Sequence, residues 1–246
     1  RATKDKAELE EIRKMGQITT SVVKRVQDFL SAHRVVDETL VKADGSPLTV
    51  GDVKSLINLW LAEAGAENPE ATIFAIGRDG GIPHSSGTPS DPIKLGKSIV
   101  FDIFPCQEGG GYFYDFTRTW SLGYATEELQ QAYDQVKEVY QQVAAELAMG
   151  VQASKYQDLT CELFEEMGHD TIRQNAAVEE GYIHSVGHGL GLNVHEKPWL
   201  GRQPDPANIL RIGSVFTLEP GLYYPSKGYG VRIEDTWFVN EDGGFE

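Results

Sequence analysis

The chain has 246 residues, with 37 acidic and 22 basic side chains, a net charge of −15 and 40% hydrophobic residues. This length and apolar content suffice for one large domain, and the 10% of aromatic residues argues against intrinsic disorder. Two cysteines exclude a disulfide scaffold, and the negative charge disfavours nucleic-acid binding through a basic face. The sequence contains neither an apolar run of the roughly 18–20 residues that a membrane helix needs nor an apolar secretion signal at its start. We therefore expect a cytoplasmic protein with no nucleic-acid and no membrane partner.

The first half of the chain predicts two helices followed by strands. Apolar side chains recur at steps of three and four over residues 7–33, which indicates an amphipathic helix packed on a core. A second helix is expected to begin near Thr49, because Thr49 and Asp52 have the spacing of a capping box. Runs of β-branched and aromatic residues, with a glycine turn at 109–111, predict strands over residues 71–76, 98–104 and 112–120.

The second half repeats this order. Helical patterns cover residues 126–149 and 154–168, and each is followed or ended by a glycine. Strands are then predicted over residues 182–185, 193–195, 215–219 and 230–239. We therefore predict a single α+β domain over residues 1–246, built from two similar halves. Because the chain begins with arginine rather than methionine, we also expect it to be a piece of a longer protein.

Four acidic residues lie within or at the ends of apolar strands, which requires an explanation. They are Asp102, Asp115, Glu219 and Glu234. A carboxylate that is buried alone costs several kcal/mol and takes up a proton instead. Any one of them could be a strand-end residue or the partner of Arg118 or Arg232, but two arginines cannot neutralise four buried carboxylates. Taken together, the four residues predict a shared cation.

Histidines strengthen this prediction. Three of the six, His184, His188 and His195, lie in a segment whose glycines at 187, 189 and 191 disfavour a helix. A lone histidine is more often structural, but three at this spacing in a glycine-rich β segment indicate a site. One imidazole and four carboxylates suit two divalent ions, which at roughly 3.5–4 Å apart would acidify a water for hydrolysis. The residues alone therefore lead to a dinuclear metallohydrolase.

The order Asp, Asp, His, Glu, Glu resembles the signature of the pita-bread metallopeptidases, the family of methionine aminopeptidase, prolidase and aminopeptidase P. The matching residues are Asp102, Asp115, His188, Glu219 and Glu234, in the strings DFTRT, GHGLG, LEPG and RIED. The resemblance covers nearly the whole chain and implies a pita-bread fold, in which helices cover a curved antiparallel or mixed sheet formed by two pseudo-symmetric halves. It also implies that the five residues hold two metal ions, with Asp115 and Glu234 bridging them. Mn²⁺ is the expected metal, and Co²⁺, Zn²⁺ or Fe²⁺ would fit the same ligands.

At two positions the sequence resembles the proline-directed branch of this family, prolidase and aminopeptidase P, rather than methionine aminopeptidase. They are His184, four positions before the matched histidine, and Arg232, just before the last glutamate. The opening Arg1…Lys4…Glu8 also resembles the start of the catalytic domain in that branch, where it follows a separate N-terminal domain. The resemblance thus implies an Xaa-Pro aminopeptidase or dipeptidase, which cleaves between an N-terminal residue and proline, and it suggests a homodimer.

Several further residues gain candidate roles from this chemistry. Glu219 is the candidate proton shuttle toward the leaving amine, because a metal-held carboxylate beside the water can accept and pass on a proton. His195 and His84 would polarise the substrate carbonyl or the tetrahedral oxyanion. His184 would contact the substrate on its proline side.

Arg232 and Tyr223 are candidates for orienting the ligands, with a plain ion pair and core packing as the alternatives. The chain departs from the family pattern between the two aspartates, where it is two residues longer and carries Phe104 in place of a glycine. We expect this difference, over residues 104–108, to affect substrate specificity more than metal binding.

Three other functions stay open at this point. A methionine aminopeptidase-like exopeptidase would use the same ligands. A catalytically inactive pita-bread module that binds proteins or peptides, and a metal-free hydrolase of the creatinase type, are disfavoured because this chain keeps all five matching residues.

Overall fold

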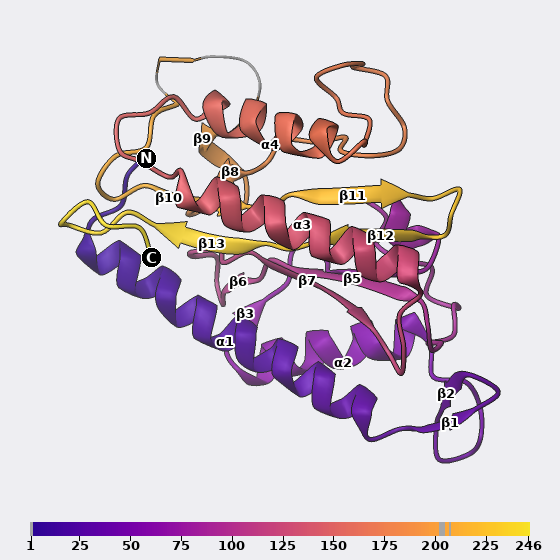
Figure 1. The fold of residues 1–246 in the computed structure, drawn as a ribbon. Coiled ribbons are helices and arrows are strands. Elements are labelled where there is room, and N and C mark those ends of the chain that lie inside the picture. Colours follow the sequence, from indigo (N-terminus) through magenta and orange to yellow (C-terminus); the bar gives the residue numbers. More distant parts are fainter. Residues whose placement is uncertain (1, 202–204, 207) are drawn as a thin grey trace.

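The computed structural model describes residues 2–201, 205–206 and 208–246, so Arg1 of the N-terminal motif lies outside the described residues. The first half of the chain contains two long helices and a three-stranded antiparallel sheet in the order β4-β5-β7 (Figure 1). Its elements are α1 (Lys6–Ser31), β1 (Arg34–Val36), β2 (Thr39–Val41), α2 (Val50–Glu63), β3 (Ala66–Glu67), β4 (Ile73–Ile76), the 3₁₀ turn η1 (Asp79–Gly81), β5 (Ser98–Ile103), β6 (Cys106–Gln107) and β7 (Phe116–Ser121).

The second half again places two helices before its strands. Its elements are α3 (Glu127–Ala145), α4 (Ser154–Glu166), β8 (His188–Gly189), β9 (Glu196–Trp199), β10 (Val215–Leu218), β11 (Gly221–Tyr224), β12 (Tyr229–Arg232) and β13 (Asp235–Phe238). The strands form a four-stranded sheet in the order β13-β10-β8-β9 and a separate β11-β12 hairpin. In Figure 1, α1 and α2 lie below β5, β7 and β13, and α4 lies above β11 and β13, while α3 packs on β11 and β12.

Capping groups define where the first two helices begin. The Asp5 side chain accepts from the N–H of Glu8 and the Glu8 side chain accepts from the N–H of Asp5, which forms a capping box at α1. Thr49 and Asp52 make the same reciprocal pair at the start of α2, as the sequence predicts. Both helices then bury their apolar face in the core of the first half.

The two halves meet along β7 of the first half and the β12–β13 segment of the second. Thr117 and Glu234 form a β-bridge across this seam. Nearby, the Thr119 hydroxyl donates to the carbonyl of Arg232 and accepts from its N–H, both at 2.9 Å. Each half has its own apolar core, and a third cluster joins the start of α1 to strands of the second half. The seam is therefore a hydrogen-bonded junction between two separately packed halves.

Several predicted strands differ in the structure. The prediction of a strand over residues 182–185 is wrong, because this segment makes only isolated bridges, such as Tyr182 with Thr171. The prediction over residues 193–195 is also wrong. Gly191 donates its N–H to the carbonyl of Asn193 at 3.0 Å, which closes a turn there, and the strand begins only at Glu196.

Long-range hydrogen bonds shorten other predicted elements. Residues 112–115 leave the β7 ladder because the N–H of Phe113 donates to the carbonyl of Gly191 at 2.8 Å. Helix α3 ends at Ala145 rather than near residue 149, since Ala148 donates its N–H to the Tyr156 hydroxyl at 3.0 Å. The predicted strand 230–239 is broken at Glu234, where the backbone bonds to β7 instead.

Candidate metal centre

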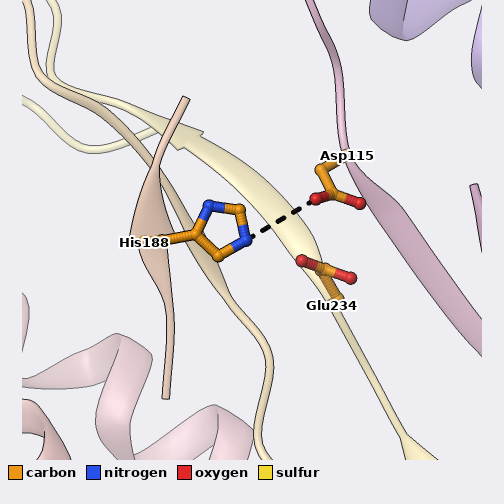
Figure 2. A group of neighbouring side chains, drawn as sticks. All are labelled: Asp115, His188 and Glu234. Atoms are coloured by element: carbon orange, nitrogen blue, oxygen red, sulfur yellow. Dashed lines mark ion pairs between the residues drawn. The ribbon is translucent and has the colours of Figure 1, made fainter. Parts of the chain in front are cut away.

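The candidate ligands come from both halves and converge at the seam. Asp102 lies on β5 and Asp115 directly precedes β7, while His188 lies on β8, Glu219 follows β10 and Glu234 lies between β12 and β13. Figure 2 shows Asp115, His188 and Glu234 facing one another across the seam. One ligand atom from each of these three side chains lies within 4.8 Å of the other two, and all three residues are buried.

A cavity of about 310 Å³ contains this cluster. All five ligands predicted from the sequence line this cavity. Four other predicted site residues line it as well, namely His84, His184, His195 and Arg232. Tyr223 is fully buried behind the cavity and does not line it. Glu70, Ile73, Phe104, Val194 and Trp199 complete much of the wall.

Several buried carboxylate oxygens lack a hydrogen-bond partner among the described residues. They are Asp102 Oδ1, Asp115 Oδ1 and Glu234 Oε1. A buried acceptor without a partner is costly, and three of them in one cavity are rare in a folded protein. Divalent cations bind such oxygens, so the donor set fits the metal site that the sequence predicts.

His188 is arranged as a metal ligand would be. Its Nδ1 lies 3.1 Å from the carbonyl of Gly189 and must donate to it, which leaves a lone pair on Nε2. That Nε2 lies 3.3 Å from Glu219 Oε1 and 3.7 Å from Asp115 Oδ2. Burial lowers the pKa of His188 to about 3, so the ring is neutral at pH 7. The Nε2 lone pair of His188 thus faces the carboxylates of Asp115 and Glu219. A cation bound among these three groups would stabilise this arrangement.

The carboxyl groups of the cluster raise one another's pKa values. Burial, followed by the charges of Asp102 and Glu219, raises the pKa of Asp115 well above its ordinary value. Burial and the charge of Asp115 do the same for Glu234. Burial, with the charge of Asp102 adding to it, raises the pKa of Glu219 to about 7. Without a cation, the site therefore retains protons that isolated carboxyls would release.

Arg232 is the one cationic side chain among the described residues that line the cavity. Its Nη2 lies 2.6 Å from Asp102 Oδ2, and its Nη1 donates to the Tyr223 hydroxyl at 2.7 Å. The Tyr223 hydroxyl in turn lies 2.8 Å from Nε2 of His184, whose Nδ1 contacts the carbonyl of Ser185 at 2.7 Å. Both ring nitrogens of His184 thus have partners in the protein, and the residue lines the cavity. Asp102, Arg232, Tyr223 and His184 form one hydrogen-bonded chain.

His84 and His195 lie in the cavity wall and are exposed. Burial of part of the ring, together with the charge of Arg232, lowers the pKa of His84. The ring of His195 lies 4.3 Å from that of His188 and stacks at 16° on the ring of Trp199, with 6.5 Å between centroids. These side chains therefore border the space inside the cavity.

Two threonines that support the ligands were not identified from the sequence. The Thr117 hydroxyl donates to Glu234 Oε2 at 2.5 Å, and the Thr217 hydroxyl donates to Glu219 Oε1 at 3.2 Å. Thr117 follows Asp115 by two positions, and Thr217 precedes Glu219 by two. Because alternate residues of a strand face the same side, this spacing was a signal that could have found them. Trp199, four positions after His195, could have been found in the same way.

The sequence profile of metallopeptidase family M24 matches residues 10–241. The chain belongs to this family, as the resemblance implied. It is 30% identical over 243 residues to the probable dipeptidase PepE of Mycobacterium tuberculosis, covering 99% of this chain and 57% of that protein. It is also 29% identical over 251 residues to the Xaa-Pro dipeptidase of Pyrococcus furiosus, covering 98% and 67% of the two chains. The chain thus spans little more than half the length of the mycobacterial relative.

Solved structures agree with this assignment. The prolidase from Pyrococcus furiosus superimposes with a TM-score of 0.79 at 28% identity, over 100% of this chain and 64% of that one. The X-Pro aminopeptidase from Thermotoga maritima gives a TM-score of 0.80 at 27% identity, over 100% and 62%. The prediction of an α+β pita-bread fold is confirmed. Within the described residues, no helix has the length and apolar character needed to cross a lipid bilayer.

Proposed function

We propose that this chain carries the catalytic site of a metal-dependent exopeptidase that hydrolyses the bond between an N-terminal residue and proline. The observation that carries the proposal is the group of unpartnered buried carboxylate oxygens around the His188 lone pair, inside a cavity large enough for a short peptide. Relatives named dipeptidase and Xaa-Pro dipeptidase support the substrate class.

Asp102, Asp115, His188, Glu219 and Glu234 would hold two divalent ions, with Mn²⁺ as the expected metal and Co²⁺, Zn²⁺ or Fe²⁺ as alternatives. When bound, such ions polarise a carbonyl and make a water strongly nucleophilic at neutral pH. Arg232 holds Asp102 in place through its ion pair, while Thr117 orients Glu234 through its hydroxyl. Ligands held in this way are ready for the metal before it binds.

Glu219 is suited to moving the proton. Its carboxyl lies at the cavity wall beside the other candidate ligands, and a carboxylate next to a metal-held water can accept and pass on a proton. It would accept a proton from the attacking water and deliver it to the nitrogen of the departing proline.

The histidines of the wall would act on the substrate. His84 and His195 could each donate one N–H to the carbonyl oxygen, where negative charge develops as the tetrahedral carbon forms. His184 has no free ring nitrogen in the structure, so it would contact the proline side with the edge of its ring and keep the Tyr223 hydroxyl in place. Proline has no backbone N–H to donate to the site, so the shape of the pocket and its contacts with the proline ring must provide the recognition of proline instead.

The test is hydrolysis of Xaa-Pro dipeptides, Xaa-Pro-Yaa tripeptides and a Met-Ala-Yaa control, after loading with Mn²⁺. We expect cleavage of the proline peptides alone, abolished in Glu219→Gln and retained in Glu166→Gln, which neutralises an exposed carboxyl on α4. Cleavage of the methionine control would favour the methionine aminopeptidase-like alternative. No turnover together with no retained metal would favour a binding module.

The remaining predictions from the sequence belong to this proposal. A single domain over residues 1–246, a homodimer, a cytoplasmic location and the absence of a nucleic-acid partner stay predictions. The acidic net charge of −15 supports the last of these.

A further inference from the structure

A buried ion pair joins the N-terminal segment to the strand that carries part of the cavity wall. Lys4 Nζ lies 2.5 Å from Glu196 Oε1, and the two side chains are only 3% and 17% exposed. The residues are 192 positions apart in the sequence. A buried ammonium group needs a partner of opposite charge, because the loss of hydration is not otherwise compensated. The pair is therefore a specific long-range link rather than a surface contact.

The backbone around the pair is shaped to admit it. A Cβ atom on Gly191 would lie 2.6 Å from Glu196 Oε1 and 2.8 Å from Lys4 Cε. A Cβ atom on Gly213, whose φ is +79°, would lie 2.2 Å from the carbonyl oxygen of Lys4. The N–H of Lys4 also donates to the carbonyl of Gly213 at 2.7 Å. Glycine at both positions lets the N-terminal segment approach closely enough for the ion pair to form.

The ion pair adjoins the part of the cavity wall that His195 and Trp199 form. Glu196 is the first residue of β9 and sits opposite Gly189 of β8. Glu196 pairs with Lys4, whereas His195, the residue before it, and Trp199, the last residue of β9, line the cavity. His195 lies in the turn that precedes β9, where its position depends on where that strand begins. Lys4 itself is anchored next to the capping box that starts α1.

We propose that Lys4 is a positioning residue, which holds His195 and Trp199 against the cavity through its ion pair with Glu196. The effect on catalysis rests on the proposed function, whereas the mechanical link between Lys4 and β9 does not. The link also makes the N-terminal segment a part of the site, although no atom of Lys4 lines the cavity.

Amide hydrogen exchange in the metal-free protein tests the link without any turnover. We expect Lys4→Met and Glu196→Gln each to accelerate exchange in residues 190–200 by about tenfold or more, with α4 unchanged. Lys197→Met is the matched control, because it removes a lysine from the same strand whose partner, Asp205 at 2.8 Å, forms an exposed pair. If Lys4→Met does not fold, Glu196→Gln carries the same comparison. Unchanged exchange in residues 190–200, or equal acceleration in α4, would overturn the link.

Kinetics with an Xaa-Pro peptide test the positioning role. We expect Lys4→Met to lower kcat about tenfold, Lys4→Arg to recover most of the loss, and Lys197→Met to match the parent protein. If the exchange changes but kcat and KM do not, Lys4 is not a positioning residue. If the parent protein cleaves no Xaa-Pro peptide while the exchange still responds, the proposed function fails and the link stands.

Discussion

Removing the metal should make the stability of this protein fall as the pH rises above neutrality. In the metal-free fold, burial and neighbouring charges raise the pKa of Glu219 to about 7 and those of Asp115 and Glu234 well above their ordinary values. In the unfolded chain these carboxyls titrate near pH 4. Between the two pKa values the folded state binds more protons than the unfolded state, so its stability decreases with increasing pH.

Histidines oppose this trend only at lower pH. Burial lowers the pKa of both His184 and His188 to about 3, so these rings stay neutral in the fold but charge in the unfolded chain below about pH 6.5. Their contribution therefore makes stability rise with pH up to 6.5 and is constant above it. Above that value, each carboxyl that still holds its proton removes about 1.4 kcal/mol of stability per pH unit. One or two such groups give a loss of about 1–3 kcal/mol between pH 7 and pH 8.

Urea unfolding at pH 7 and pH 8 measures this loss directly. We expect it in EDTA-treated protein and not in Mn²⁺-saturated protein, because bound cations keep the carboxyls ionised at both pH values. The variant Asp115→Asn should reduce the slope, and Glu166→Gln on the exposed face of α4 should not. A metal-free protein whose stability is flat or rises between pH 7 and pH 8 would refute this account of the site, as would an identical pH dependence with Mn²⁺.

Three further variants test individual parts of the site. Arg232→Met should lower the free energy of unfolding of the metal-free protein by about 3–5 kcal/mol, since it leaves Asp102 buried without its partner; a change below 1 kcal/mol in urea unfolding would contradict this. Trp199→Ala should raise KM for Xaa-Pro peptides about tenfold with little effect on kcat, while Leu192→Ala, which is exposed outside the cavity, should leave both unchanged. His188→Ala should retain less Mn²⁺ per chain after gel filtration, measured by elemental analysis, and full retention would exclude the imidazole as a ligand.

Local patterns in the sequence predicted the parts of the fold that local physics controls. The helix over residues 7–33 is found as α1, Lys6–Ser31, because its apolar periodicity and its N-terminal cap act within a few turns. The convergence of Asp102, Asp115, His188, Glu219 and Glu234 on one cavity was predicted from the cost of burying carboxylates singly and from a family resemblance.

Long-range contacts set the features that the sequence did not reveal. Residues 112–115 have the composition of a strand, yet the N–H of Phe113 pairs with Gly191 of the other half. The Lys4–Glu196 ion pair could not be predicted for the same reason, since no residue near Lys4 in the sequence indicates a buried partner 192 positions away. Hairpin and helix propensities act over a few residues, so they cannot predict which segments of the two halves exchange hydrogen bonds.

The charge balance of the seam accounts for several of these features together. Four buried or nearly buried carboxylates, Asp102, Asp115, Glu219 and Glu234, face a single guanidinium, that of Arg232, among the described cavity residues. If all ionise, three negative charges remain uncompensated, which is why the metal-free site holds its protons instead. One divalent cation would leave a negative charge unbalanced, whereas two would leave one positive charge in excess. A site that held two such cations would reach neutrality by binding one anion, and a hydroxide ion is the anion that the proposed hydrolysis would use. The ligands are also divided between the halves, with Asp102 and Asp115 from the first and His188, Glu219 and Glu234 from the second. Cations bound by all five would therefore link the two halves across the seam as well as supply the chemistry.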